Sequence, residues 1–223
     1  QTVDVKLSAS ETISGAGLLT FVLSDLDLYA GYQGMGVQLT GGSLSIATIT
    51  ANKTPATEVK DKRSWTALSA AIGSAGLVGI DRVSATLSDL SLQINQASGK
   101  YDPNVNVSGD ELKAQALDWT TALDLNADGV FGDVLNPGAL LPTPVDLTVS
   151  LTGPLLQVSG RLAELNVYDV LVGSAQFALS TQTVDVKLSA SETISGAGLL
   201  TFVLSDLDLY AGYQGMGVQL TGG

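Results

Sequence analysis

Apolar and polar residues alternate at the start of the chain. Val3, Val5 and Leu7 are each followed by a polar residue, and this alternation is typical of a β-strand with one buried face. Residues 43–50 alternate in the same way, and residues 145–179 also fit a series of strands. The pattern therefore predicts an all-β chain.

The apolar positions change phase near Asp25. Leu19 and Phe21 lie at odd positions, whereas Leu26 and Leu28 lie at even positions. A straight strand cannot bury both sets on one face, because successive side chains point to opposite faces. We therefore expect the chain to bulge or turn a corner at this point.

The sequence around this phase change recurs later in the chain. Residues 87–92 (LSDLSL) closely copy residues 23–28 (LSDLDL), and residues 162–167 (LAELNV) fit a looser form of the same template. The apolar positions around residues 87–92 also change phase. We interpret the three segments as diverged modules, each consisting of a strand, a corner and a second strand.

The first 42 residues return without a mismatch as residues 182–223. A protein core tolerates many hydrophobic substitutions, so this identity indicates a recent duplication and not a physical requirement. Residues 1–181 are interpreted as one complete repeat, and residues 182–223 as the start of the next identical repeat in a tandem array. No linker-like sequence separates Thr181 from Gln182, so adjacent repeats are expected to share one sheet or core.

These observations predict an elongated β-solenoid or a continuous β-sheet with at most one or two short helices. A capping-box pattern before residue 112 predicts a short helix over residues 112–117. Residues 65–80 fit either a helix or a strand. Residues 51–63 are interpreted as a polar loop or hairpin, and residues 136–144 as a linker rich in proline and glycine.

Composition excludes several classes of function. The formal net charge is −12, which makes nucleic acid and anionic membrane surfaces poor partners. The chain has no cysteine and no histidine, which excludes disulfides, thiolate or imidazole metal sites and Ser-His or Cys-His catalysis. No apolar run approaches the roughly 20 residues that a membrane-spanning helix needs. This composition suits an exported bacterial protein.

Residues 124–133 (DLNADGVFGD) carry the sharpest local motif. Carboxylate, amide and carboxylate oxygens alternate there, followed by a turn glycine and a backbone carbonyl, and such hard oxygen ligands suit Ca²⁺. The alternative is a turn rich in Asp and Asn that needs no ion. The predicted calcium ligands are Asp124, Asn126, Asp128, the carbonyl of Val130, and Asp133.

Other candidates are weaker. Asp25 and Asp27 could pair as in glycoside hydrolases, but we interpret them as the polar face that follows the corner. Trp65, Trp119, Tyr29 and Tyr32 could form a sugar platform, although packing in the core or at an edge is favoured. A basic stretch at residues 53–63 and an acidic stretch at residues 102–133 are either solvated loops or lateral contacts between arrays.

The tandem copy, the acidic cysteine-free composition and the DLNADG loop together resemble the long repeats of giant bacterial cell-surface proteins and adhesins. The loop itself is similar to the calcium loops of EF-hand and dockerin-type proteins. This resemblance implies an extracellular, calcium-stiffened, all-β stalk on the bacterial cell surface. The leading hypothesis is thus a structural repeat of a fibre, filament or adhesin stalk, whose partners are neighbouring repeats and lateral copies.

Two other hypotheses differ in class from the structural one. A ligand- or carbohydrate-binding adhesin module would need an exposed aromatic or acidic pocket in each repeat. An enzyme would need a nucleophile with a base beside it. The sequence offers no such pair, so we expect no catalytic activity.

Overall fold

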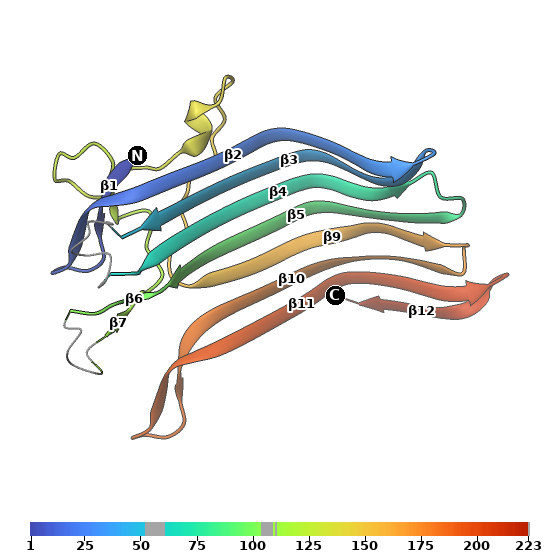
Figure 1. Cartoon of the computed structure of the whole chain (residues 1–223). Helices are drawn as coiled ribbons and strands as arrows, with labels where there is room; N and C mark the ends of the chain where they lie inside the picture. The colour runs from blue at the N-terminus through green and yellow to red at the C-terminus, as the bar shows by residue number, and fades with distance from the viewer. Residues whose placement is uncertain (52–60, 104–108, 110, 223) are drawn as a thin grey trace. The chain divides into compact units, whose positions relative to one another are not determined.

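The computed structural model describes residues 1–51, 61–103, 109 and 111–222. Ten strands form one antiparallel sheet in the order β12-β11-β10-β9-β5-β4-β3-β2-β1-β8, and β6 pairs with β7 separately (Figure 1). The prediction of an all-β chain with a continuous sheet is confirmed. The sheet has two open ends, so no solenoid is observed in the described part of the chain.

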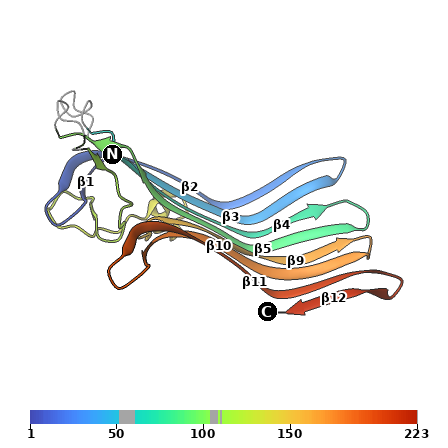
Figure 2. The same cartoon turned by 90° about the horizontal axis from the view of Figure 1, so that it is seen from below.

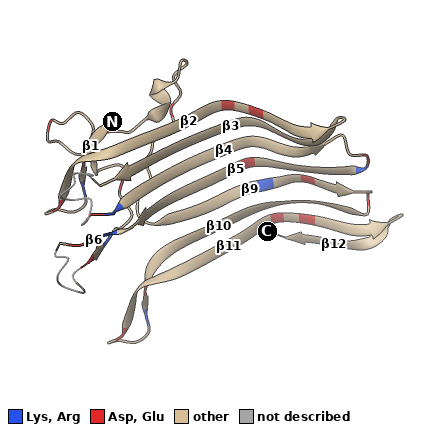
Figure 3. Cartoon of the chain, viewed as in Figure 1, with Lys and Arg blue, Asp and Glu red and all other residues tan. Residues whose placement is uncertain are grey.

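The strands and the single 3-10 turn, η1, have the following bounds: β1 Thr2–Lys6, β2 Thr12–Tyr32, β3 Met35–Thr50, β4 Ser64–Val78, β5 Val83–Ser98, β6 Lys100–Tyr101, β7 Leu112–Lys113, β8 Leu123–Asp124, η1 Pro137–Leu140, β9 Leu155–Val167, β10 Leu171–Lys187, β11 Thr193–Tyr213 and β12 Met216–Gly222. The long strands carry few charges (Figure 3). β3 and β4 contain no charged residue at all. Their β-branched residues, such as Ile46, Ile49 and Ile72, favour a paired, extended backbone.

The chain divides into two compact units, which we name the capped unit and the open unit. The long strands β2, β3, β4 and β5 each contribute residues to both. The capped unit comprises Gln1–Val22, Leu44–Ser69 and Gln93–Leu156, and the open unit comprises Leu23–Ser43, Ala70–Leu92 and Gln157–Gly223.

The capped unit holds the hydrophobic core. One face of its strands packs against residues 114–154, which we name the cap and which lie beside β1 in both views (Figures 1 and 2). The sheet contributes buried residues at alternate positions, as the pleat requires: Val3, Val5, Ala16, Leu18, Ala47, Ile49, Ala51, Trp65 and Ala67. The cap contributes Leu117, Trp119, Ala122, Leu123, Leu135, Val149 and Leu151.

The predicted change of phase corresponds to a β-bulge, at which an aspartate has a positive φ in the left-handed region of backbone conformation. Asp25 has a φ of 52° and Asp89 a φ of 53°. Asp206, the copy of Asp25, has a φ of 49°, and β11 carries one extra residue there against β10. In the third proposed module, Glu164 is not among the residues with positive φ, so that segment has no matching bulge residue.

The bulge aligns the apolar residues of β2 on one face, but that face is not the buried one. Leu19 is 71% exposed and Phe21 is 51% exposed, whereas Ala16 and Leu18 are buried. The phase change predicts which residues share a face but not which face the cap covers. The cap covers the face that carries Ala16 and Leu18.

The second copy of the repeat folds like the first. β11 and β12 begin at the residues that correspond to the first residues of β2 and β3. Val3 pairs with Ala16 in β1 and β2, and Val184 pairs with Ala197 in β10 and β11, with the same shift of register after each pair. Strand β10 runs from Leu171 to Lys187 and passes from one repeat into the next without a break.

Several local predictions are wrong or untested. The predicted helix over residues 112–117 is not formed, because Leu112–Lys113 is strand β7 and pairs with Lys100–Tyr101. Of the two side chains of the proposed capping box, Ser108 lies outside the described residues, and Glu111 forms an ion pair with Lys100. Tertiary pairing overrides the local helical signal here.

Further along the chain, the ambiguous segment 65–80 is almost entirely strand β4. The proposed linker at 136–144 is part of the cap, since Pro137 and Gly138 in η1 are buried. Residues 145–154 are irregular cap chain, and strands resume only at Leu155. Most of the predicted loop at 51–63 lies outside the described residues.

Candidate functional site

A buried amide ties the cap to the sheet of the capped unit. Asn95 on β5 is 1% exposed, and its Nδ2 donates hydrogen bonds of 2.7 Å to the carbonyls of Leu117 and Gly153. Its Oδ1 accepts a 2.9 Å hydrogen bond from Nε1 of Trp119. A buried polar group without partners would cost several kcal/mol, so these bonds require the cap to lie in one position.

Backbone pairing fixes the cap at the end of the sheet. Strand β8 in the cap pairs with β1, so that Val5 faces Leu123, and the N–H of Lys6 donates to the carbonyl of Ala122 at 2.8 Å. The backbone N–H groups of β1 would otherwise face solvent as an open edge. The cap therefore extends the sheet as well as covering its face.

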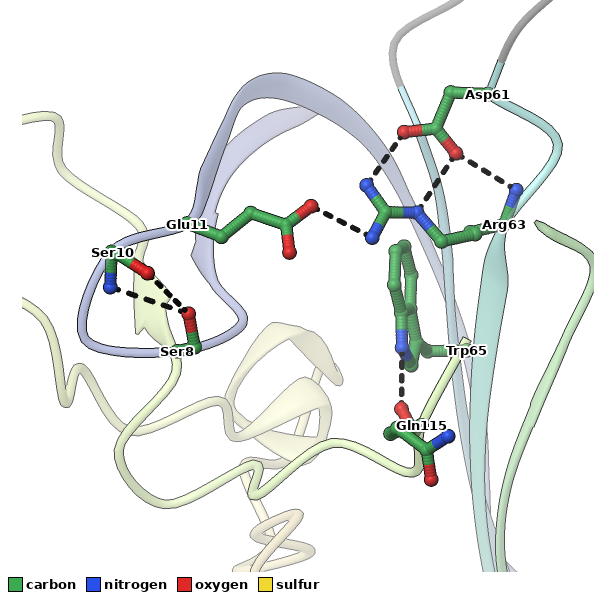
Figure 4. A network of polar contacts seen from close by, with 7 residues as sticks. All are labelled: Ser8, Ser10, Glu11, Asp61, Arg63, Trp65 and Gln115. Carbon is green, nitrogen blue, oxygen red and sulfur yellow. Dashed lines mark hydrogen bonds and ion pairs between the residues drawn. The ribbon is translucent and has the colours of Figure 1, made fainter. Parts of the chain in front are cut away.

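A buried arginine forms a second tie between sheet and loop (Figure 4). Arg63 is 5% exposed and forms ion pairs of 2.8 Å with Glu11 and with Asp61. Its guanidinium lies 5.8 Å from the ring centroid of Trp65, whose Nε1 donates to the carbonyl of Gln115 at 2.9 Å. The guanidinium thus has a charged or aromatic partner on several sides, as a buried cation requires.

The electrostatics of Arg63 follow from these partners. Burial acts to lower the pKa of Arg63, but its hydrogen bonds to Asp61 and Glu11 outweigh burial and raise the pKa above its ordinary value. The residue falls at the end of the predicted basic loop at 53–63, yet it is part of the core. Arg63 lies at an odd-numbered position, as do the buried residues Trp65 and Ala67, and this alternation is the sequence pattern that indicates its burial.

A cleft of about 600 Å³ lies beside this network in the capped unit. Its walls carry charges of both signs, so it has no single charge preference. The ion pair between Lys100 and Glu111 lies near it. The charged or aromatic lining residues are Lys6, Glu11, Arg63, Trp65, Glu111, Lys113 and Asp118.

The predicted calcium loop lies in the cap and is organised around Asp124. This side chain is 2% exposed. Its Oδ1 accepts a 2.7 Å hydrogen bond from the N–H of Ala127, and its Oδ2 accepts a 2.8 Å hydrogen bond from the N–H of Gly129. Ala127 and Gly129 have φ values of 60° and 83°, which allow the chain to curl around the carboxylate.

The other three predicted side-chain ligands also accept hydrogen bonds from the loop backbone. Asn126 accepts one from the N–H of Asp128 at 2.9 Å, and Asp128 accepts one from the N–H of Val130 at 2.8 Å. Asp133 accepts one from the N–H of Leu125 at 2.8 Å. These Asx turns shape the loop without an ion, and carboxylate and amide oxygens keep further lone pairs that could bind one.

In the part of the chain that the structure describes, no group of three or more Asp, Glu, His or Cys side chains is placed to hold a metal. Two of the five predicted ligands, the amide of Asn126 and the carbonyl of Val130, are of other kinds, and all five lie in one loop of the cap.

Other sequence candidates have structural roles. Trp65 is 1% exposed and Trp119 is fully buried, so neither ring offers a platform for a sugar. Asp27 accepts a 3.0 Å hydrogen bond from the N–H of Gly41, and Asp25 is the bulge residue. This pair of carboxylates shapes the strands of the open unit.

Comparisons with known proteins identified no protein similar to this chain. A scan against protein-family models, a search of curated proteins and a search of solved structures found no match to this chain. Among the described residues, no helix is long and apolar enough to cross a bilayer. Any assignment of function therefore rests on the geometry of the chain's own residues.

Proposed function

We propose that this chain is a structural repeat of an extracellular bacterial fibre or adhesin stalk, in which successive repeats add strands to one continuous sheet. The observation that carries the proposal is the course of β10, Leu171–Lys187, which crosses the boundary between repeats as a single strand. β11 then pairs next to it with the bounds of β2, β12 begins at the counterpart of the first residue of β3, and Asp206 repeats the positive φ of Asp25. A boundary inside a strand favours a shared sheet over separate domains.

The strand order sets the expected size of one repeat. The C-terminal part of β10 corresponds to β1, so equivalent strands are separated by six strand positions in the sheet, which β1, β2, β3, β4, β5 and β9 occupy; the short strand β8 extends only the edge at β1. Neighbouring strands lie about 4.8 Å apart, so each added repeat would lengthen the sheet by up to about 29 Å.

The location is part of the same proposal. An array with a net charge of −12 over 223 residues and no cysteine suits an exported protein that stays soluble as it lengthens. The identical copies suit a function that depends on length. Catalysis is not part of this proposal, because the chain has no histidine or cysteine.

Calcium is proposed to stiffen the cap at residues 124–133. Asp124, Asn126, Asp128, the carbonyl of Val130 and Asp133 would hold the ion through oxygen lone pairs that the Asx turns leave free. The ion would neutralise like charges within the loop. In an array, each cap would then respond to calcium in the same way.

Chains of one, two and four complete repeats test the structural proposal. Small-angle scattering and negative-stain images should show a maximum dimension that rises by a constant step of up to about 29 Å per repeat. A compact particle whose radius grows only slowly with chain length would contradict it. A chain of separate beads joined by flexible linkers would contradict it as well.

A second candidate function, a carbohydrate-binding adhesin module, is favoured by the cleft of about 600 Å³ beside Arg63. Clefts of this size hold small ligands. A glycan-array screen followed by calorimetry tests it, with Glu111→Ala as the variant that alters the lining. The candidate fails if no glycan binds, or if binding is unchanged in the variant.

A further inference from the structure

One surface of the repeat occurs twice in this chain, once covered and once uncovered. Val5 in β1 and Val186 in β10 occupy the same position of the repeat. Their backbones agree closely, since Val5 pairs with Ile13 and Val186 pairs with Ile194. The turns that follow them also carry equivalent hydrogen bonds from Leu7 and Leu188.

The exposure of the two copies differs. Val5 is fully buried and Leu18 is 5% exposed, whereas Val186 is 38% exposed and Leu199 is 40% exposed. Val3 and Ala16 are likewise buried in the first copy, and their counterparts Val184 and Ala197 are only partly buried in the second. Because sequence and local backbone are shared, the difference comes from the neighbours of each surface. In the first copy these are the cap and the C-terminal part of β3, whereas in the second copy β12 pairs with β11 only over residues 207–213.

The cap accounts for the difference along β1, and it covers β2 together with β3. It packs on Val3, Val5, Ala16 and Leu18 in one hydrophobic cluster, and its strand β8 pairs with β1. The chain contains one copy of the cap, residues 114–154, and two copies of the surface that the cap covers.

We propose that the surface formed by Val184, Val186, Ala197 and Leu199 is the docking site for a second cap, a copy of residues 114–154 carried by the repeat that follows. The proposal rests on the proposed tandem array and deepens it, because it names what each added repeat supplies. Burial of four apolar side chains and closure of one strand edge would drive the docking.

The polar groups for this docking are also present in the second copy. Lys187 corresponds to Lys6, whose N–H donates to the carbonyl of Ala122 in the cap. Glu192 is exposed and corresponds to Glu11, whose partner Arg63, at 2.8 Å, lies just before β4 and outside the cap, so the rest of the following repeat would supply its counterpart. The second surface therefore offers the same hydrogen-bond donor and the same carboxylate as the first.

The absence of cysteine in the chain makes a direct test possible. Val186→Cys is introduced in the present chain and in a chain lengthened by its own residues 43–181, which completes the second repeat. The rate of reaction with a thiol reagent should fall at least about tenfold in the lengthened chain, because modification then requires local opening of the cap. Val5→Cys supplies the reference for a covered position in both chains.

Two further measurements keep the test decisive. Trp119→Ala placed only in the second cap should restore rapid labelling at Val186→Cys while leaving Val5→Cys protected. Equal labelling of Val186→Cys in the short and lengthened chains would overturn the proposal. So would protection of the short chain that grows with protein concentration, because this would show that a second molecule covers the surface.

The result is independent of whether the array forms a fibre. Protection of Val186→Cys in the lengthened chain without a constant increase in particle length would keep the docking and refute the proposed stalk. Lengthening without protection would keep the stalk and refute the docking.

Discussion

The indole N–H of Trp119 donates a 2.9 Å hydrogen bond to the side-chain oxygen of Asn95, and both residues are buried. The two residues come from different layers, since Asn95 lies on β5 and Trp119 lies in the cap. The amide of Asn95 also donates to two cap carbonyls, so one side chain satisfies three polar groups of the cap. The cap therefore has a polar anchor inside its apolar interface.

Loss of this anchor should destabilise the capped unit. Asn95→Ala would leave the N–H of Trp119 and two carbonyls without partners, so we expect the free energy of unfolding to fall by about 3 kcal/mol. Urea denaturation monitored by tryptophan fluorescence measures this change. Gln96→Ala, at the exposed neighbouring position, is the control and should change stability by less than about 0.5 kcal/mol. A loss below about 1 kcal/mol for Asn95→Ala would contradict the anchor.

The two copies of one glutamate should differ in importance. Glu11→Gln weakens the ion pair with buried Arg63, so we expect it to reduce stability by about 1–2 kcal/mol. Glu192→Gln is the same substitution in the exposed copy and should change stability by less than about 0.5 kcal/mol. Chemical denaturation of both variants at the same pH measures the difference. Equal effects would show that the ion pair contributes nothing specific to the capped unit.

Acid should weaken the cap through Asp118. The hydrogen bond from the hydroxyl of Thr120 lowers the pKa of Asp118 below its ordinary value of 3.8, against the opposing effect of burial. Since the folded-state pKa is the lower one, this contribution to stability is present above the unfolded-state pKa and is lost as pH falls through the folded-state pKa.

Thr120→Val removes the hydroxyl donor and tests this effect. The free energy of unfolding of the variant should depend less steeply on pH than that of the wild type between about pH 4 and pH 2. Urea titrations at several pH values measure the slopes. Parallel curves for the two proteins would exclude the hydroxyl of Thr120 as a source of the pH dependence, since the bonds from Thr121 to Asp118 remain in the variant.

Calcium should stabilise the cap if residues 124–133 bind it. At about 100 times its Kd, one bound ion adds about 2.7 kcal/mol to stability, so Tm should rise with calcium and fall with a chelator. Asp128→Ala should abolish the rise. Asp146→Ala, which removes a cap carboxylate outside the loop that accepts from Thr148, should retain it. An unchanged Tm for the wild type would remove the ion from the proposal.

Glycine should be tolerated at one module and not at another. Asp89 has a φ of 53°, a conformation that glycine adopts without strain, so Asp89→Gly should leave stability unchanged or raise it by up to about 1 kcal/mol. Glu164→Gly lies in a regular strand and removes an acceptor for the hydroxyl of Ser84, so it should lower stability by about 1 kcal/mol. Thermal denaturation compares the two. Equal losses would contradict the assignment of a bulge to the module of Asp89 and not to the module of Glu164.

The strands were predictable because their signals are local. Alternation marks β1, and the change of parity between Phe21 and Leu26 marks the bulge at Asp25. A period of two in the sequence needs no knowledge of distant residues. The choice of buried face does need it, and for this reason Leu19 and Phe21 are exposed although their pattern suggested burial.

The cap was not predictable in the same way. The cap has little regular structure. It is held in place by hydrogen bonds of Asn95, which accepts from the indole of Trp119 and donates to the distant carbonyl of Gly153. Such bonds leave no periodic trace in the sequence. The predicted linker over 136–144 failed for this reason, whereas the predicted helix over 112–117 failed because Leu112–Lys113 pairs with Lys100–Tyr101. The Asp-rich motif at 124–133 was recognisable, because Asx turns depend on residues close in sequence.

Equivalent strands of the two copies are separated by an even number of positions in the sheet, and this parity determines whether successive copies would point in the same direction. Six antiparallel steps separate β2 from β11, so the two equivalent strands point in the same direction. With an odd number, every other copy would run backwards. An array that grows in even steps would have a head and a tail, with all its caps on one side and the opposite side left bare.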